Sequence, residues 1–260
     1  MQNTDTSPIH ASRESLVVNH RFHGPPDSGN GGYVVGLVAS AIKGVAEVTL
    51  LKPPPLDTPL VLEKTNERVR LLDQEIELAV GRPATLDLDV PPPPSLAEAE
   101  AAAARYPEFA PFIVPTCFVC GLNRTEGDGL CIHTGMLEGY DKPDVASPWV
   151  IDGSLIADDG LIAPEFLYAA LDCPGYFSVY RDKQPLVALL GRMTGEVIAR
   201  PKAGETCIVT AWRIASIGRK HDVGTAVFRA DGSILARARS TWIELKAPRL
   251  DNGRLTTSKP

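Results

Sequence analysis

Residues 24–44, Gly24-Pro-Pro-Asp-Ser-Gly-Asn-Gly-Gly-Tyr-Val-Val-Gly-Leu-Val-Ala-Ser-Ala-Ile-Lys-Gly44, decide the fold of this chain. A polar, glycine-rich turn leads into an apolar segment with almost no charge. Aliphatic residues recur at helical spacing from Val34 to Ile42, and small or apolar residues occupy the other positions. A helix that is apolar nearly all round is a buried helix. We therefore predict a buried helix that Asn30 caps, that begins near Gly31 and that Gly44 ends.

Most of the remaining chain has the composition of β-strands. A second helix is predicted from Pro164, a favourable first helical residue, to Cys173, and Pro174 should kink or end it. Asp231-Gly232 predicts a two-residue hairpin turn. The strands are predicted at residues 15–23, 45–51, 59–70, 72–80, 86–90, 148–151, 154–157, 186–190, 195–199, 206–214, 220–229 and 233–245.

A segment rich in proline and alanine divides the chain into two halves. Four prolines at residues 91–94 stiffen it, and the alanine and glutamate residues that follow favour a helix. We predict a linker here, with a helix that docks if the halves touch. The predicted organisation is a flexible tail at 1–14, a first unit at 15–90, the linker at 91–115, a second unit at 116–246 and a flexible tail at 247–260.

The two halves share a short sequence pattern. A basic residue and proline, then an acid and threonine, then two aliphatic residues occur twice, at an offset of 148 residues (201 minus 53). The matched residues are Lys52-Pro53, Asp57-Thr58 and Leu60-Val61 in the first half and Arg200-Pro201, Glu205-Thr206 and Ile208-Val209 in the second. The pattern favours an internal duplication. The alternative is coincidence, because these residue types are common at strand ends.

Composition and charge exclude several classes of protein. With 44% hydrophobic and 22% charged residues, the chain can bury a core. A formal net charge of −6 argues against a nucleic-acid surface. The polar N-terminus predicts no signal peptide, and no apolar run is long enough to predict a membrane span. Five cysteines without a secretory context predict reduced thiols and a cytoplasmic location.

Several motifs resemble those of hotdog-fold acyl-CoA thioesterases. Gly31-Gly32-Tyr33 resembles the helix entrance of a first hotdog unit. The second half resembles a PaaI-like unit in Cys117-Phe-Val-Cys-Gly121 with Gly129-Leu130, in Trp149, and in the segments 163–175 and 218–243. The resemblance covers roughly residues 15–90 and 115–246. It implies an α+β double hotdog, in which two curved antiparallel sheets each wrap a central helix and join edge to edge.

The resemblance also implies a chemistry. Hotdog enzymes mostly act on thioesters of coenzyme A or acyl carrier protein, without a cofactor. Hydrolysis needs a carboxylate that activates water or attacks the carbonyl, and backbone N–H groups that hold the thioester oxygen. We expect such donors from Gly31, Gly32 and Tyr33 in the first half, and from Gly160 with Leu161 in the second. The alternative is that these glycines only make tight turns.

The choice of carboxylate starts from the second predicted helix, because residues 33–44 of the first carry no acid. Asp172 lies in an apolar run, where a carboxylate needs a partner or a raised pKa. Tandem hotdog thioesterases carry an aspartate on this helix, assisted by a threonine and a glutamine. Thr194 is the candidate threonine, but Gln184 is not a convincing glutamine. The alternative role of Asp172 is a helix-terminal cap.

Other residues near the helix starts are weaker candidates for the chemistry. Asp159 and Glu165 flank the second helix, where an N-cap role explains Asp159 better and a role as an early-turn acid that favours the helix dipole explains Glu165 better. Asn30 is a candidate for orienting water or the carbonyl, beside its capping role. His20 and His23 precede the first helix, where a surface strand explains them. We expect one competent site, built with the acids of the second half.

Two further groups carry possible ligands. Arg219 and Lys220 are candidates for binding the phosphates of coenzyme A, although a solvated strand end explains them too. Four residues, Cys117, Cys120, Cys131 and His133, have the types of a zinc site. Relatives with the same motif are not metal proteins as a rule, so we predict no metal.

The functional prediction is therefore a thioesterase-like enzyme acting on an acyl-CoA-type small molecule. The alternatives are a non-catalytic module that binds acyl-CoA or lipid, and a hydratase or dehydratase on the same fold. Nucleic-acid and membrane partners are not expected. Exposed sheet edges allow further pairing into a homo-oligomer.

Overall fold

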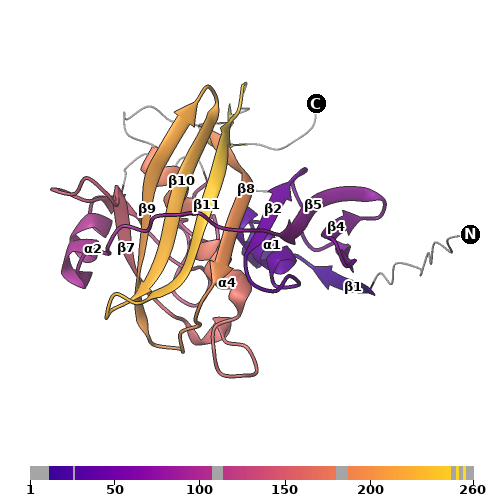
Figure 1. The fold of residues 1–260 in the computed structure, drawn as a ribbon, viewed down its shortest axis with the longest axis horizontal. Helices are drawn as coiled ribbons and strands as arrows, with labels where there is room; N and C mark the ends of the chain where they lie inside the picture. The colour runs from indigo at the N-terminus through magenta and orange to yellow at the C-terminus, as the bar shows by residue number, and fades with distance from the viewer. Residues whose placement is uncertain are drawn as a thin grey trace, which may run out of the picture.

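The structure is a computed structural model that describes residues 12–25, 27–106, 114–179, 187–246, 250–251 and 254–255. One large antiparallel sheet dominates it, with the helices α1 and α4 on one face (Figure 1). In the described residues the strand order is β1-β3-β4-β5-β2-β8-β11-β10-β9-β7-β6. The strands are β1 (Ser12–Val17), β2 (Ala46–Leu50), β3 (Pro59–Lys64), β4 (Val69–Asp73), β5 (Ile76–Pro83), β6 (Gly135–Met136), β7 (Val145–Val150), β8 (Ala188–Val197), β9 (Thr206–Ile217), β10 (Lys220–Arg229) and β11 (Ile234–Glu244).

The strand order of one half repeats that of the other. Reading outward from the central pair, the first half runs β2-β5-β4-β3-β1 and the second runs β8-β11-β10-β9-β7. The halves join where β2 pairs with β8, with Ala46 opposite Gly195. Pro53 follows β2 and Pro201 follows β8, so the sequence pattern at an offset of 148 residues (201 minus 53) falls at equivalent places.

The helix predicted at the glycine turn is α1 (Gly31–Ala39). The Asn30 side chain accepts a hydrogen bond from the backbone N–H of Tyr33, which confirms the predicted cap. Most of the helix is buried, including Val34, Val35 and Val38. The helix ends at Ala39, earlier than predicted, and a turn connects it to Gly44, which has a φ of 78°.

The second predicted helix is two short helices. They are α4 (Pro164–Ala170) and α5 (Cys173–Val179), separated by Leu171 and Asp172. Pro164 is the first residue of α4, as predicted. Pro174 does not end a helix but lies in the first turn of α5. The N–H that proline lacks would have no helical partner in the first turn, so the helix loses no hydrogen bond. The break therefore lies immediately before Cys173, and the backbone of Asp172 bonds to Ala169 on one side and Gly175 on the other.

Two glycines let α1 and α4 pack closely. A Cβ atom added at Gly36 would lie 2.5 Å from the Cα of Glu165, and one added at Gly32 would lie 2.6 Å from the carbonyl oxygen of Tyr168. Both neighbours are backbone atoms, which cannot move aside without shifting α4. Gly32 and Gly36 lie one turn apart on the same face of α1, so this contact stripe depends on the absence of side chains.

The linker covers the second half of the sheet. Its helix α2 (Leu96–Ala103) begins with a capping box between Ser95 and Glu98, and Ala99 and Ala102 are buried. The segment before α2 crosses β11, β10 and β9 on the face away from α1 and α4 (Figure 1), and Leu88 and Val90 pack on the cluster that contains Trp212. The prediction of a docked helix is therefore confirmed.

Several predicted boundaries differ from the structure. The strand predicted at 59–70 is β3 and the start of β4, because residues 65–68 form a turn. No strand forms at 86–90 or 154–157, and the segments predicted separately at 186–190 and 195–199 belong largely to the single strand β8. At the ends, β1 begins inside the predicted tail, and β12 (Leu250–Asp251) pairs with β13 (Arg254–Leu255). The predicted hairpin forms between β10 and β11, but its turn is not the predicted two-residue type. The Gly232 N–H donates to the carbonyl of Arg229, and Gly232 rather than Asp231 has a positive φ, of 87°.

Candidate functional site

Asp172 lies against the start of α1, so the two halves meet at this carboxylate. Its Oδ2 atom accepts a hydrogen bond from the backbone N–H of Gly32 at 2.9 Å and one from the Asn30 side-chain amide at 3.0 Å. The Cβ of Asp172 occupies the space that a Gly32 side chain would need, at 2.5 Å. Gly32 is therefore the residue that allows the carboxylate to reach the helix start.

Asn30 is held by both of its side-chain ends. Its Oδ1 accepts from the Tyr33 N–H at 2.9 Å, while its Nδ2 donates to Asp172 Oδ2 at 3.0 Å. The amide therefore has one orientation, in which one side chain both caps α1 and contacts Asp172. The Tyr33 ring stacks on Phe22 with ring centroids 4.4 Å apart, so this tyrosine contributes packing rather than a polar group.

The second oxygen of Asp172 is unpaired among the residues that the structure describes. Oδ1 is buried and makes no hydrogen bond within the described part of the chain. The N–H of Gly31, the first residue of α1, has no acceptor in the described residues either. First-turn N–H groups lack helical partners and carry partial positive charge. The start of α1 and the Asp172 carboxylate therefore each keep one polar group without a partner among the described residues, the Gly31 N–H and the Oδ1 atom.

An apolar cavity of about 330 Å³ adjoins these groups. Asn30, Gly31 and Asp172 contribute to its wall. The remaining wall is mainly apolar and comes from both halves, with Leu50, Pro53, Pro54, Tyr176, Phe177, Leu189, Leu190, Trp242, Ile243 and Leu245 among its residues. A mostly apolar cavity with a few convergent polar groups is the usual form of a small-molecule site.

Burial raises the pKa of Asp172 to about 7. The nearby Cys117 raises this pKa further, whereas the hydrogen bonds from Gly32 and Asn30 lower it. A carboxyl group whose pKa lies near neutrality is ionised in part of the population and accepts a proton readily, as a general base must.

We expect the raised pKa of Asp172 to make the stability of the protein depend on pH. Below pH 4 the carboxyl is protonated in both states. Between pH 4 and pH 7 the unfolded chain is ionised while the folded protein keeps the proton, so stability falls as pH rises and then levels off. The full loss is about 4 kcal/mol at most.

The variant D172N lacks this titration. Its free energy of unfolding in urea, compared with that of the wild type from pH 4 to pH 8.5, should show a difference that grows in its favour up to pH 7. A difference that does not change with pH would contradict the raised pKa.

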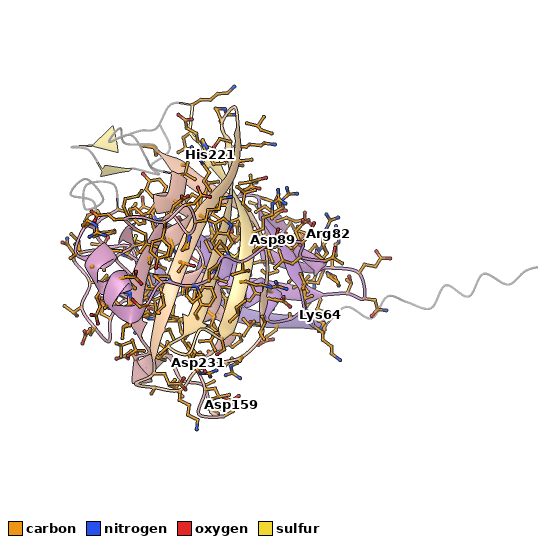
Figure 2. All side chains as sticks on the ribbon, turned by 60° about the vertical axis from the view of Figure 1, so that its left-hand side comes forward. Lys64, Arg82, Asp89, Asp159, His221 and Asp231 are labelled. Carbon is orange, nitrogen blue, oxygen red and sulfur yellow. The ribbon has the colours of Figure 1, made fainter. Side chains whose placement is uncertain are left out.

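The structure does not bring the other predicted carboxylate and the threonine to the cavity. Asp159 is exposed in a loop at one end of the molecule, while His221 lies at the other end (Figure 2). The Asp159 carboxylate pairs with Arg200 at 2.6 Å, and this pairing lowers the pKa of Asp159. The same carboxylate accepts a hydrogen bond from the N–H of Leu161. Thr194 is directly opposite Glu47 and donates to it at 3.4 Å.

Strand alternation explains the position of Thr194. Its neighbours Met193 and Gly195 are buried, and a Cβ at Gly195 would lie 3.2 Å from the Tyr168 ring of α4. Successive residues of a strand point to opposite faces, so Thr194 points away from the helices. The prediction that Thr194 assists Asp172 is therefore corrected, because the two side chains do not meet. Gln184 lies outside the described residues.

Gly160 is not at a helix start. It has a φ of 81° in an exposed turn, its N–H donates to the carbonyl of Ala157, and α4 begins only at Pro164. The donors predicted in the second half are therefore wrong. Glu165 packs against α1 at Gly36.

The predicted basic pair lies in the hairpin between β9 and β10. Arg219 donates to the carbonyl oxygen of Glu244 at 2.7 Å, and Lys220 is exposed. Glu244 lies between Ile243 and Leu245, which line the cavity. Arg219 therefore contacts the residue between two cavity-lining residues at the end of β11.

Three cysteines that also line the cavity were only partly foreseen. Cys117, Cys120 and Cys173 have their sulfur atoms within 4.8 Å of one another. Cys131 and His133, which the sequence grouped with the first two, are not part of this cluster. The sequence signal was the Cys-x-x-Cys spacing, but nothing in the sequence connects it to Cys173.

Solved structures with a similar fold include an acyl-CoA thioesterase II, TesB2, from Mycobacterium marinum. It is 12% identical, with a TM-score of 0.59 over 90% of this chain and 93% of that chain. A protein of unknown function with a hotdog fold from Alicyclobacillus acidocaldarius is 14% identical, with a TM-score of 0.53 over 91% and 94%. This chain has the hotdog fold. A GphF dehydratase variant shares the fold as well, at 14% identity, a TM-score of 0.55 and coverage of 94% and 96%.

Other comparisons define the limits of this similarity. No family model matches the sequence, and no curated protein sequence matches it. The hotdog fold is therefore recognised from the structure and from short motifs rather than from overall sequence similarity. No helix in the described residues has both the length and the apolar character needed to cross a membrane.

Proposed function

We propose that this chain is a double hotdog enzyme that hydrolyses thioesters of coenzyme A or acyl carrier protein, with Asp172 as the general base. The observation that carries the proposal is the buried carboxylate with a free oxygen at the start of α1, in the wall of an apolar cavity. Such a site offers a base, a donor and an acyl-binding surface within one cavity.

Two features support the double hotdog. The second half repeats the strand order of the first around the β2–β8 pair. Along the chain, α1 comes between β1 and β2 in the first half, and α4 comes between β7 and β8 in the second. The repeated sequence pattern falls at the same point of both halves. We infer that the halves descend from one hotdog unit.

The proposed reaction uses water as the nucleophile. Asp172 Oδ1 takes a proton from water as the water oxygen attacks the thioester carbonyl carbon. The tetrahedral intermediate then collapses, the carbon–sulfur bond breaks, and the proton held by Asp172 goes to the leaving thiolate. The products are a carboxylic acid and a free thiol. Asn30 and Gly32 occupy Oδ2, which leaves Oδ1 as the oxygen for water.

The Gly31 N–H is the proposed donor to the thioester oxygen. The oxygen gains negative charge as the tetrahedral intermediate forms, and the start of α1 provides both a hydrogen bond and a favourable dipole. Gly32 and Tyr33, predicted as donors with it, use their N–H groups within the site, on Asp172 and Asn30 respectively. Their role is to hold the base and the cap.

We expect G31P to lower kcat by roughly 10²- to 10³-fold, the usual effect of losing one such donor. Proline is tolerated at the first helical position, where it removes the N–H and adds side-chain carbons. G31A is the matched control, since it keeps the N–H and meets the same side chains of Leu190 and Leu50 at 3.2–3.3 Å. Steady-state kinetics on the three proteins measures the difference. Equal losses in both variants would contradict the donor role.

The apolar wall fits an acyl chain, and the basic pair fits the phosphates of coenzyme A. We expect the double variant R219A/K220A to raise KM for an acyl-CoA roughly fivefold without changing kcat, as expected for an exposed ionic contact of about 1 kcal/mol. The effect should shrink at high salt. A change in kcat with KM unaltered would contradict this role.

Release of free thiol from a panel of acyl-CoA and acyl-carrier-protein thioesters tests the function. Turnover by the wild type supports an enzyme, and the preferred chain shows what the cavity accepts. Binding without turnover would indicate the non-catalytic module instead. The hydratase alternative has less support, because no histidine lines the cavity in the described residues. The five cysteines are free thiols, which fits the proposed cytoplasmic location.

A further inference from the structure

Three thiols from two distant segments meet in the wall of the cavity. Cys117 and Cys120 precede the second half of the sheet, and Cys173 begins α5. The sulfur atoms of Cys117 and Cys173 are 3.6 Å apart, and all three sulfurs lie within 4.8 Å of one another. Cys131 and Cys207 are free thiols outside this cluster.

The backbone between Cys117 and Gly121 forms a tight turn. Gly121 closes the turn by donating to the carbonyl of Cys117 at 2.9 Å. A Cβ at Gly121 would lie 2.6 Å from the Cys117 nitrogen and from the Pro115 oxygen, so the turn requires glycine.

The spacing of the sulfurs is close to that of a thiolate metal site. Zinc–sulfur bonds of about 2.3 Å in a tetrahedral site place two sulfurs roughly 3.8 Å apart. The 3.6 Å separation of Cys117 and Cys173 is near this value, and the third sulfur needs a shift of about an ångström at most. A Cys-x-x-Cys turn plus one distant cysteine is a common ligand arrangement for zinc.

We propose that Cys117, Cys120 and Cys173 bind one Zn²⁺ ion, with the fourth coordination position facing the cavity. Thiolates select soft or borderline metals such as zinc over magnesium or calcium. A cation also balances the charge of several thiolates next to the Asp172 carboxylate, which is otherwise costly in a buried site. All three cysteines line the cavity, which provides the path for the ion.

This ligand set differs from the one that the sequence offered. Cys131 is only partly buried and has a φ of 53°, and His133 packs on the Tyr106 ring with centroids 4.9 Å apart. Cys173 takes the third position instead. The proposal does not depend on thioester hydrolysis, because metal uptake is measured without turnover.

The test is a Zn²⁺ titration of the reduced, chelator-treated full chain in competition with a chromophoric chelator. We expect the wild type to take up one equivalent. C120S removes the least buried of the three ligands, and it should lower affinity by more than the roughly 100-fold that loss of an outer-shell partner costs. C131S and C207S are matched controls that should retain wild-type affinity.

Two further measurements keep the test independent of folding. Zn²⁺ should protect Cys117, Cys120 and Cys173 of the wild type from alkylation while leaving Cys131 reactive. Co²⁺ should give thiolate-to-metal charge-transfer absorption that weakens in C173S. Absence of stoichiometric binding by the reduced wild type, or equal weakening in C131S and C120S, overturns the proposal. A Cys117–Cys173 disulfide in a protein that takes up no zinc when reduced also overturns it and indicates a redox pair.

Discussion

D172N should lose thioester hydrolysis, with kcat reduced by roughly 10²- to 10⁴-fold, the contribution typical of a general base. Asparagine has the size of aspartate, and its oxygen can still accept from Gly32 and Asn30. It cannot take a proton from water at Oδ1. The measurement is release of free thiol from the best acyl-CoA of the panel, with the folded state checked by thermal unfolding.

The matched control for D172N is D159N, since both remove one carboxylate charge from the second half. Asp159 is exposed and paired with Arg200, away from the cavity wall. D159N should keep wild-type kcat. The pH profile adds a second readout, because kcat/KM of the wild type should rise with pH to a plateau above about pH 7. Equal activity of D172N and D159N would remove Asp172 from the mechanism.

G36A should destabilise the protein by about 2–3 kcal/mol, the cost typical of overpacking in a core. In an exposed helix the same change is stabilising by about 1 kcal/mol, because glycine is a poor helix former. Here the new methyl group would lie 2.5 Å from the Cα of Glu165 and 2.8 Å from its carbonyl oxygen. Urea unfolding at constant pH measures the change.

A control for G36A is available at Gly153, where an added Cβ meets nothing within 4 Å. G153A should change stability by less than about 0.5 kcal/mol, as most surface substitutions do. If G36A were as stable as the wild type, α1 and α4 would not be in the close contact described. Because Gly32 continues the same stripe, a shift of α4 should also lower activity through Asp172.

Local patterns predicted the parts of the fold that depend on neighbouring residues. The Asn30 cap, the buried helix, the hairpin at Asp231-Gly232 and the docked alanine-rich helix all follow from short-range rules, and the structure bears them out. Asp172 stood out because a carboxylate in an apolar run requires a partner. The partner of Asp172 depends on packing between the halves. The sequence therefore did not predict that the Gly32 N–H binds Asp172, or that Gly32 and Gly36 let α4 approach α1.

The failures also have physical causes. Thr194 was placed by its position after the helix, but a shift of one residue in a strand moves a side chain to the other face. Gly160 resembles a helix start, yet its φ of 81° belongs to a turn that comes four residues before α4. Cys173 joins Cys117 only through the tertiary structure, so spacing along the chain pointed to Cys131 and His133 instead.

The covalent connection of the two halves through the linker has a consequence for how the protein can evolve. In an assembly of two identical subunits, every substitution appears at two symmetry-related places, and an improvement at one is forced on the other. In the proposed double hotdog each copy changes alone. Under the proposed function, the first copy is then free to keep its helix devoid of acids and present donors, while the second keeps the aspartate, and selection acts on a single asymmetric centre.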